Sequence, residues 1–166
     1  MDMHLQWVRL DGADGHNAGR SLLAQMYTEA TGQPMPSIAV TGSGKPYFPQ
    51  DALHFSISHT PCHAFCCLSR TNVGIDAEEE SRQVDLRLAE RYFSQNEQAR
   101  LAAAAEDPRK AFLRIWVLKE AYAKLTGHGI GNYLKNTDFS PDDPRISQID
   151  GCFVAVITEE GEAYAV

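Results

Sequence analysis

Residues 73–78 read Val73-Gly74-Ile75-Asp76-Ala77-Glu78. Val73 to Ile75 predict the end of a buried strand, and Asp76 and Glu78 follow two positions apart as the chain leaves the sheet. Because side chains alternate across a strand, both carboxylates should project from the same side. Mg²⁺ prefers such hard oxygen ligands, since it keeps several waters and takes only a few protein oxygens. The stretch therefore predicts a sheet with a candidate magnesium site where one strand ends.

The sequence from Trp116 to Lys124 has the spacing of a helix. At roughly 100° per residue, Glu120 and Lys124 share one face. The opposite side can pack into a core and consists of Ile115, Leu118, Tyr122 and Leu125. On a solvated helix, such a Glu-Lys pair would contribute only a few tenths of a kcal/mol. Together with Asp76 and Glu78, it instead predicts a cleft where a metal-bound diphosphate could sit.

The order of the remaining patterns predicts an α+β fold. Strands are expected at Leu5–Leu10, Leu53–Ser58, Ala64–Leu68 and Val73–Ile75, and helices at Asn17–Thr31, Leu86–Tyr92, Asn96–Ala104 and Lys110–Leu125. Gly32 should close the first helix. Cys152–Thr158 and Glu162–Val166 should form a terminal hairpin around Glu160-Gly161. In the strand at 53–58, apolar side chains alternate with polar ones, and His59 ends that alternation.

Four segments together resemble the 4′-phosphopantetheinyl transferases of the larger, surfactin-synthetase-activating type. They span residues 44–130, just over half of the chain, and follow the family's order: Gly44-Lys45-Pro46, Phe55 to Thr60, Gly74 to Glu78, and Trp116 to Lys124 followed by Gly127-His128-Gly129-Ile130. A fifth segment, Phe93 to Glu97, also fits the family. Ser94 and Glu97 form a capping box, however, so helix initiation explains that segment without catalysis.

The resemblance implies a reaction in which the phosphopantetheine arm of coenzyme A moves to a serine of an apo acyl, peptidyl or aryl carrier protein, releasing adenosine 3′,5′-bisphosphate. It also implies a monomer built as a pseudo-two-fold pair of similar α+β halves, with coenzyme A between them. Residues 1–166 would then form a single unit, with an N-terminal half at 1–75 and a C-terminal half carrying the metal site at 76–166. The first half looks short for the family, so coenzyme A could bind less tightly or a second subunit could complete the site.

The family's site residues carry over by position. Asp76, Glu78 and Glu120 resemble the ligands of Mg²⁺, with Mn²⁺ as the alternative ion. Lys124 resembles the cation that pairs with a phosphate oxygen. Glu120 is also the best placed general base, although a metal-coordinated carboxylate is a poor base. The family's phosphate contacts and its lysine near the adenine and 3′-phosphate correspond to Ser58, His59 and Lys45.

Composition agrees with a cytoplasmic enzyme. The 166 residues are 43% hydrophobic, enough for the core of one domain, and no apolar run approaches the ~20 residues of a membrane span. The N-terminus has no basic region leading into an apolar stretch. A net charge of −7 argues against nonspecific nucleic-acid binding. Residues 82–124 nevertheless carry nine basic against six acidic side chains, which favours this stretch for docking an acidic carrier protein.

The cysteines do not have the spacing of a zinc site. Structural zinc sites use paired Cys-x₂₋₄-Cys knuckles, whereas Cys152 lies far downstream of Cys62, Cys66 and Cys67 with no ligand beside it. Alternation in the predicted strand at 64–68 instead indicates buried free thiols that behave as small hydrophobes. Without a secretory signal, disulfides are not expected either.

Two other functions also fit some of the motifs. Another Mg²⁺-dependent phosphoryl or nucleotidyl transfer enzyme could use the same carboxylates and lysine, but it gives no reason for Ser58-His59 or for Gly44-Lys45-Pro46. A noncatalytic module that binds coenzyme A or a carrier protein is the second possibility, against which the intact charged residues speak. The sequence leaves open the carrier, the use of acyl coenzyme A, and the pathway, whether fatty acid, polyketide or nonribosomal peptide synthesis.

Overall fold

The first sheet of the computed structural model is antiparallel and covered on one face by a helix. The structure describes residues 3–104, 106–129 and 132–159. The sheet has the order β1-β5-β4, formed by β1 (Met3–Arg9), β5 (His63–Ser69) and β4 (His54–His59), and α1 (Gly15–Thr31) lies against it. Helix α1 begins at Asp14, whose side chain accepts the N–H of Asn17, and ends at Gly32 in the left-handed conformation, as expected of a C-terminal glycine.

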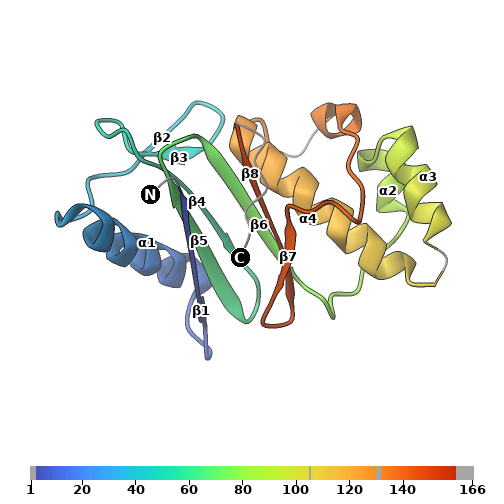
Figure 1. Cartoon of the computed structure of the whole chain (residues 1–166), viewed down its shortest axis with the longest axis horizontal. Helices are drawn as coiled ribbons and strands as arrows, with labels where there is room; N and C mark the ends of the chain where they lie inside the picture. The colour runs from blue at the N-terminus through green and yellow to red at the C-terminus, as the bar shows by residue number, and fades with distance from the viewer. Residues whose placement is uncertain (1–2, 105, 130–131, 160–166) are drawn as a thin grey trace.

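The second sheet is also antiparallel and lies beside the first. It has the order β6-β8-β7, formed by β6 (Val73–Glu79), β8 (Cys152–Thr158) and β7 (Ile146–Ile149). Helix α4 (Pro108–Thr126) covers its outer face, and α2 (Leu88–Tyr92) and α3 (Gln95–Ala103) pack beyond α4 (Figure 1). The short strands β2 (Ala39–Val40) and β3 (Pro46–Tyr47) pair with each other, and a 3₁₀ helix, η1, spans Asn132–Asn136.

The two sheets share a core between them, so the order of layers is helix, sheet, sheet, helix. Strand β5 is buried on both faces. Cys66 and Leu68 pack with α1, whereas Phe65 and Cys67 pack with residues of β6 and β8. The four cysteines are free thiols. The expected buried thiols at positions 66 and 67 are therefore confirmed, with one on each face of the strand.

Serine hydroxyls connect the two sheets where β4 meets β6. Strand β6 lies at the edge of its sheet, so half of its backbone N–H groups point away from β8. The hydroxyl of Ser56 accepts the N–H of Ile75, and the hydroxyl of Ser58 accepts the N–H of Ala77, both at 3.1 Å. These bonds satisfy buried donors that the sheet leaves over, and they hold the end of β4 against Asp76.

The α+β fold class is confirmed, and most expected elements occur within a few residues of their predicted bounds. One expectation was wrong: Asp76 and Glu78 do not follow the strand, because β6 continues to Glu79 and pairs along its whole length with the apolar β8. Strand β8 pairs with β7, which the sequence did not predict. The expected strand Glu162–Val166 and turn Glu160-Gly161 lie outside the described residues. The division into halves at 75 and 76 stays a prediction. Among the described residues, no helix is long and apolar enough to span a membrane.

Candidate functional site

A cleft of about 570 Å³ lies between the two sheets and receives residues from α1, the loop before β3, β4, β6 and α4. Six of the seven predicted site residues line it: Lys45, Ser58, His59, Asp76, Glu120 and Lys124. The seventh, Glu78, is two residues beyond Asp76 on the same face of β6. Residues from both parts of the chain therefore meet at one place. Ile130, at the end of the fourth family segment, lies outside the described residues.

Gly74 brings α4 close enough to β6 to form this cleft. A Cβ atom at position 74 would lie 2.6 Å from the backbone nitrogen of Leu125 and closer still to the carbonyl oxygen of Ala121. Only glycine permits this approach. Because Gly74, Asp76 and Glu78 share one face of the strand, the same approach brings Glu120 and Lys124 of α4 to the two carboxylates.

Asp76 is the most buried acid of the cleft, with 6% of its surface exposed. Its Oδ1 accepts hydrogen bonds from the hydroxyl of Ser58 at 3.1 Å and from Lys124 Nζ at 3.0 Å. Its Oδ2 is buried and has no hydrogen-bond partner among the described residues. Lys124 therefore pairs with the strand across the cleft, and the alternative of a Glu120-Lys124 pair on a solvated helix does not describe it.

The three carboxylates disfavour one another's charge. Burial, reinforced by the charge of Asp76, raises the pKa of Glu120 to about 7. The same two causes raise the pKa of Glu78 to about 7, against the opposing effect of Arg82, which donates a hydrogen bond to it. Burial also raises the pKa of Asp76, although Lys124 and Ser58 oppose the rise. A cation that joined these groups would relieve both their repulsion and their desolvation.

The donor set suits a divalent cation that prefers oxygen. Carboxylate oxygens are the ligands of Mg²⁺, and the unpartnered Oδ2 of Asp76 is a buried acceptor that a cation would satisfy. The ligand oxygens of Asp76, Glu78 and Glu120 do not all lie within 4.8 Å of one another. Holding one ion directly would therefore require these side chains to converge, or some contacts to pass through water.

Basic side chains besides Lys124 also line the cleft. His59 is exposed at the end of β4, where its ring lies beside the start of α1. His16 and Arg20 of α1 also line the cleft, and the sequence did not identify either as a site residue. They are one turn apart, which places them on one face of the helix. The spacing along the sequence indicates that the two side chains share a helix face, but it does not show whether that face is turned toward the cleft.

Lys45 lines the cleft, but its ammonium group donates hydrogen bonds to other residues of the chain. Lys45 Nζ donates to Asn72 Oδ1 at 2.5 Å and to the carbonyl oxygen of Leu125 at 2.8 Å. Burial lowers the pKa of this lysine. In this arrangement its ammonium holds the C-terminal end of α4, and its stem forms part of the wall beside Gly127.

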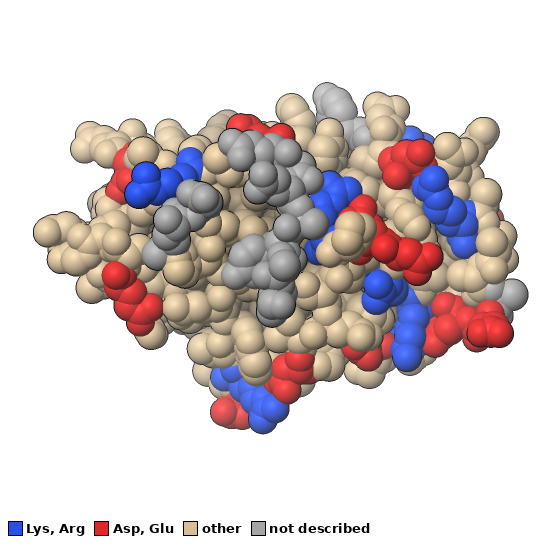
Figure 2. All heavy atoms as spheres, in the orientation of Figure 1, with Lys and Arg blue, Asp and Glu red and all other residues tan. Residues whose placement is uncertain are grey.

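The basic stretch at 82–124 is less available than its charge suggests. Lys119 is fully buried and pairs with Glu97 at 2.6 Å, and Lys124 faces the cleft. Arg87 and Arg100 form ion pairs with acids on the surface, and Arg82 pairs with Glu78 of the candidate site. Figure 2 shows acidic and basic side chains interspersed on the visible face, with no continuous basic patch there. The buried Glu97 keeps its capping role and also holds Lys119, a role that the capping box does not reveal.

Comparison with known proteins agrees with these motifs. Residues 72–159 match the model of the family described as the 4′-phosphopantetheinyl transferase superfamily. The chain is 34% identical over 149 residues to 4′-phosphopantetheinyl transferase psf-1 of Bacillus pumilus, covering 87% of this chain and 57% of that protein. It is 38% identical over 88 residues to the transferase gsp of Aneurinibacillus migulanus, covering 52% of this chain and 36% of that protein.

A third relative is 4′-phosphopantetheinyl transferase Sfp of Bacillus subtilis, which is 36% identical over 90 residues, covering 52% of this chain and 39% of that protein. The chain thus spans about half the length of the curated relatives it matches. The matched segments include β6 and α4, which supply Asp76, Glu78, Glu120 and Lys124.

Proposed function

The chain belongs to the 4′-phosphopantetheinyl transferase superfamily, and we propose that it transfers the phosphopantetheine arm of coenzyme A to a serine of an apo carrier protein. One observation carries the proposal: a single cleft between the sheets joins a buried, incompletely bonded Asp76 to Glu120 and Lys124, and His16, Arg20 and His59 line the same cleft. This combination of carboxylates and basic side chains suits a substrate that carries both a diphosphate and a nucleotide phosphate.

In the proposed reaction, the serine oxygen of the carrier attacks the phosphorus atom that carries the pantetheine arm. A new oxygen–phosphorus bond forms, the bond within the diphosphate breaks, and adenosine 3′,5′-bisphosphate leaves. Glu120, which lines the cleft, would take the serine proton, through a water of the bound ion when it also holds that ion. Lys124, fixed by Asp76, offsets the negative charge that develops on the phosphate oxygens.

Asp76, Glu78 and Glu120 would hold Mg²⁺, with Mn²⁺ as the alternative ion. When bound, such an ion supplies charge neutralisation for the diphosphate. The residues of the chain do the positioning. Ser58 fixes Asp76 from β4, and Gly74 sets the distance between β6 and α4. Of the other lining residues, His59, His16 and Arg20 would bind the 3′-phosphate, and the stem of Lys45 would face the adenine.

The carrier protein would contact the segment that follows β6 in the chain, where Leu86 and Leu88 are exposed apolar side chains. Arg87, between them, pairs with Asp85, and Arg91 lies over the ring of Tyr92, so the segment offers apolar contact more than free positive charge. Because the wider basic stretch is also largely paired, segment 86–91 is a narrower candidate than residues 82–124.

The test is the intact mass of candidate apo carriers after incubation with the protein, coenzyme A and Mg²⁺. A gain of one phosphopantetheine on one carrier, lost when its acceptor serine becomes alanine, supports the proposal. Coenzyme A binding by calorimetry with no transfer to any acyl, peptidyl or aryl carrier would favour the noncatalytic module instead. Another Mg²⁺-dependent phosphoryl or nucleotidyl transfer is the less favoured alternative, because the matched relatives are named as phosphopantetheinyl transferases.

A further inference from the structure

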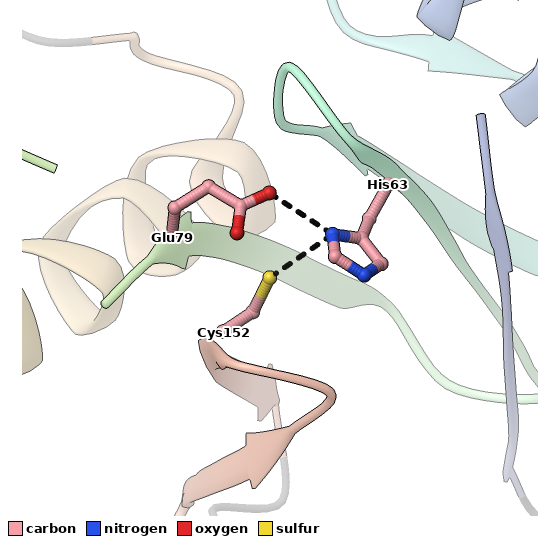
Figure 3. A group of neighbouring side chains, drawn as sticks. All are labelled: His63, Glu79 and Cys152. Atoms are coloured by element: carbon pink, nitrogen blue, oxygen red, sulfur yellow. Dashed lines mark hydrogen bonds and ion pairs between the residues drawn. The ribbon is translucent and has the colours of Figure 1, made fainter. Parts of the chain in front are cut away.

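A second group of possible metal ligands lies where the two sheets meet, away from the cleft. His63 begins β5, Glu79 ends β6 and Cys152 begins β8. Figure 3 shows the three side chains pointing toward one another from these separate strands. His63 Nδ1 lies 2.9 Å from Glu79 Oε1 and 3.4 Å from Cys152 Sγ. Among the described residues, this is the group of three whose ligand atoms all lie within 4.8 Å of one another.

The group is separate from the proposed catalytic site. None of its members lines the cleft. Glu79 follows Glu78 directly in β6, and because side chains alternate along a strand, the two carboxylates point to opposite faces. Glu78 faces α4, whereas Glu79 faces the first sheet and contacts His63. The catalytic proposal therefore leaves these three residues without a role.

The imidazole of His63 is held in the orientation that metal-binding histidines use. Its Nε2 lies 2.7 Å from Asp150 Oδ2, and Asp150 is in turn paired with Arg9 at 2.7 Å. A carboxylate on the far ring nitrogen holds a proton there, so that Nδ1, which faces Glu79 and Cys152 in this structure, is the nitrogen that would coordinate once it has lost its own proton. The hydroxyl of Thr60 donates to Glu79 Oε1 at 2.5 Å, so the carboxylate is also held from outside the group.

We propose that His63, Glu79 and Cys152 form a zinc site that joins the two sheets. Thiolate, imidazole and carboxylate are the ligand types that Zn²⁺ accepts, with bond lengths of about 2.0–2.3 Å. The three ligand atoms already lie within 4.8 Å of one another, so small side-chain movements would bring them to such bond lengths around one ion. On binding, the thiol of Cys152 and, where His63 is an imidazolium, its Nδ1 each release a proton to solvent, and His63 keeps the proton on Nε2 that it donates to Asp150. Zn²⁺ remains in the same oxidation state.

Burial keeps Cys152 protonated when no ion is bound, and a protonated thiol is a weak metal ligand. His63 and Cys152 are buried, whereas Glu79 is partly exposed and gives an entry path. Burial raises the pKa of the Cys152 thiol to about 12, so without a cation the sulfur stays protonated. The ion would connect β5 of the first sheet to β6 and β8 of the second. Its binding free energy would thus stabilise the joined fold.

The sequence could not indicate this site, because its members come from three separate strands. The expectation of no zinc site rested on the spacing of cysteines along the chain, and Cys62, Cys66 and Cys67 are not members of this group. Cys152 finds its partners through the pairing of β8 with β6 and the packing of the two sheets.

Cobalt substitution tests the proposal, since tetrahedral Co²⁺ bound to a thiolate absorbs strongly in the visible and near ultraviolet. The full chain, freed of metal by chelation and kept reduced with a phosphine, is titrated with Co²⁺ in the presence of excess Mg²⁺. We expect saturation at one ion per chain, a sulfur-to-cobalt absorption band, and one-for-one displacement by Zn²⁺. The carboxylates of the catalytic cleft cannot give that band, because they contain no sulfur.

Matched cysteine variants locate the ion. Cys152→Ser should lose the sulfur band, and zinc should no longer raise its thermal midpoint, while Cys62→Ser, at an exposed thiol, should behave as the wild type. Asp150→Asn should keep the band but weaken Co²⁺ binding roughly tenfold or more, as is typical when a partner of a metal-binding histidine is removed. Because that variant leaves all three ligands in place, it tests the site even if Cys152→Ser does not fold.

Two results would overturn the proposal. A wild-type chain that binds Co²⁺ without the sulfur band would leave the group as a hydrogen-bonded network only. A band lost in Cys62→Ser and kept in Cys152→Ser would mean that the ion binds an exposed thiol.

Discussion

Replacing Gly74 by alanine should disturb both the fold and the reaction, because this glycine sets the distance between β6 and α4. The added Cβ would lie 2.6 Å from Leu125 N and closer to Ala121 O, and both atoms are helix backbone that no side-chain rotation can move aside. Helix α4 would have to retreat by about 1 Å. Overpacking of this kind typically costs about 1–3 kcal/mol.

The same displacement would carry Glu120 and Lys124 away from Asp76. A misplacement of about 1 Å can reduce turnover roughly 10²-fold. Urea unfolding and transfer kinetics are measured together on Gly74→Ala, with Gly42→Ala as the control, since position 42 has open space and an ordinary backbone conformation. Wild-type stability and turnover in Gly74→Ala would refute the close approach of α4 to β6 on which the site depends.

Three further predictions follow from individual side chains. Lys124→Ala should lower turnover roughly 10²-fold, and it should lower unfolding stability by about 1–3 kcal/mol because Asp76 stays buried without its cation. Added Mg²⁺ should restore the stability of Lys124→Ala but not its turnover. Lys124→Arg should recover stability better than turnover. Full turnover in Lys124→Ala would mean that this lysine has only a structural role. His59→Ala should raise the KM for coenzyme A more than the KM for 3′-dephospho coenzyme A, and an equal rise would place His59 elsewhere on the substrate. Burial alone would lower the pKa of His63, but hydrogen bonds to Asp150 and Glu79 outweigh it and leave the pKa raised. In metal-free buffer, the stabilisation from His63 should therefore be complete below about pH 6.5 and be lost as pH rises through the higher folded pKa. Urea unfolding from pH 6 to 9 should show this loss of stability in the wild type and not in His63→Gln. The other neighbours of the imidazole are Cys152 and Trp7, and Arg9 pairs with Asp150. Parallel stability profiles for the two proteins would contradict the prediction.

Local patterns in the sequence predicted most of the first sheet and the helices. The 3.6-residue period gave α4, the alternation at 53–58 gave β4, and Ser94 with Glu97 gave the start of α3. The strand at 73–79 was expected to end at Ile75, where the apolar run of the sequence stops. Pairing with the apolar β8 extends it to Glu79.

The sequence motifs predicted which residues belong to the candidate site, but not how those residues contact one another. Six of the seven proposed residues meet in one cleft, but the sequence did not indicate that Lys124 would bond Asp76 or that Lys45 would bond the end of α4. His16 and Arg20 depend on how α1 packs, which a single helix period does not specify. The buried Lys119-Glu97 pair was counted among surface charges for the same reason.

The central claim is that this cleft transfers phosphopantetheine and that Asp76 is essential to it. The most direct measurement is the intact mass of one responsive apo carrier, incubated with coenzyme A and Mg²⁺ and either the wild-type chain or Asp76→Ala. The account predicts a gain of one phosphopantetheine with the wild type, abolished by chelation of Mg²⁺ and nearly absent with Asp76→Ala. Equal gains with both proteins at ordinary Mg²⁺ concentrations would contradict the assignment of the cleft.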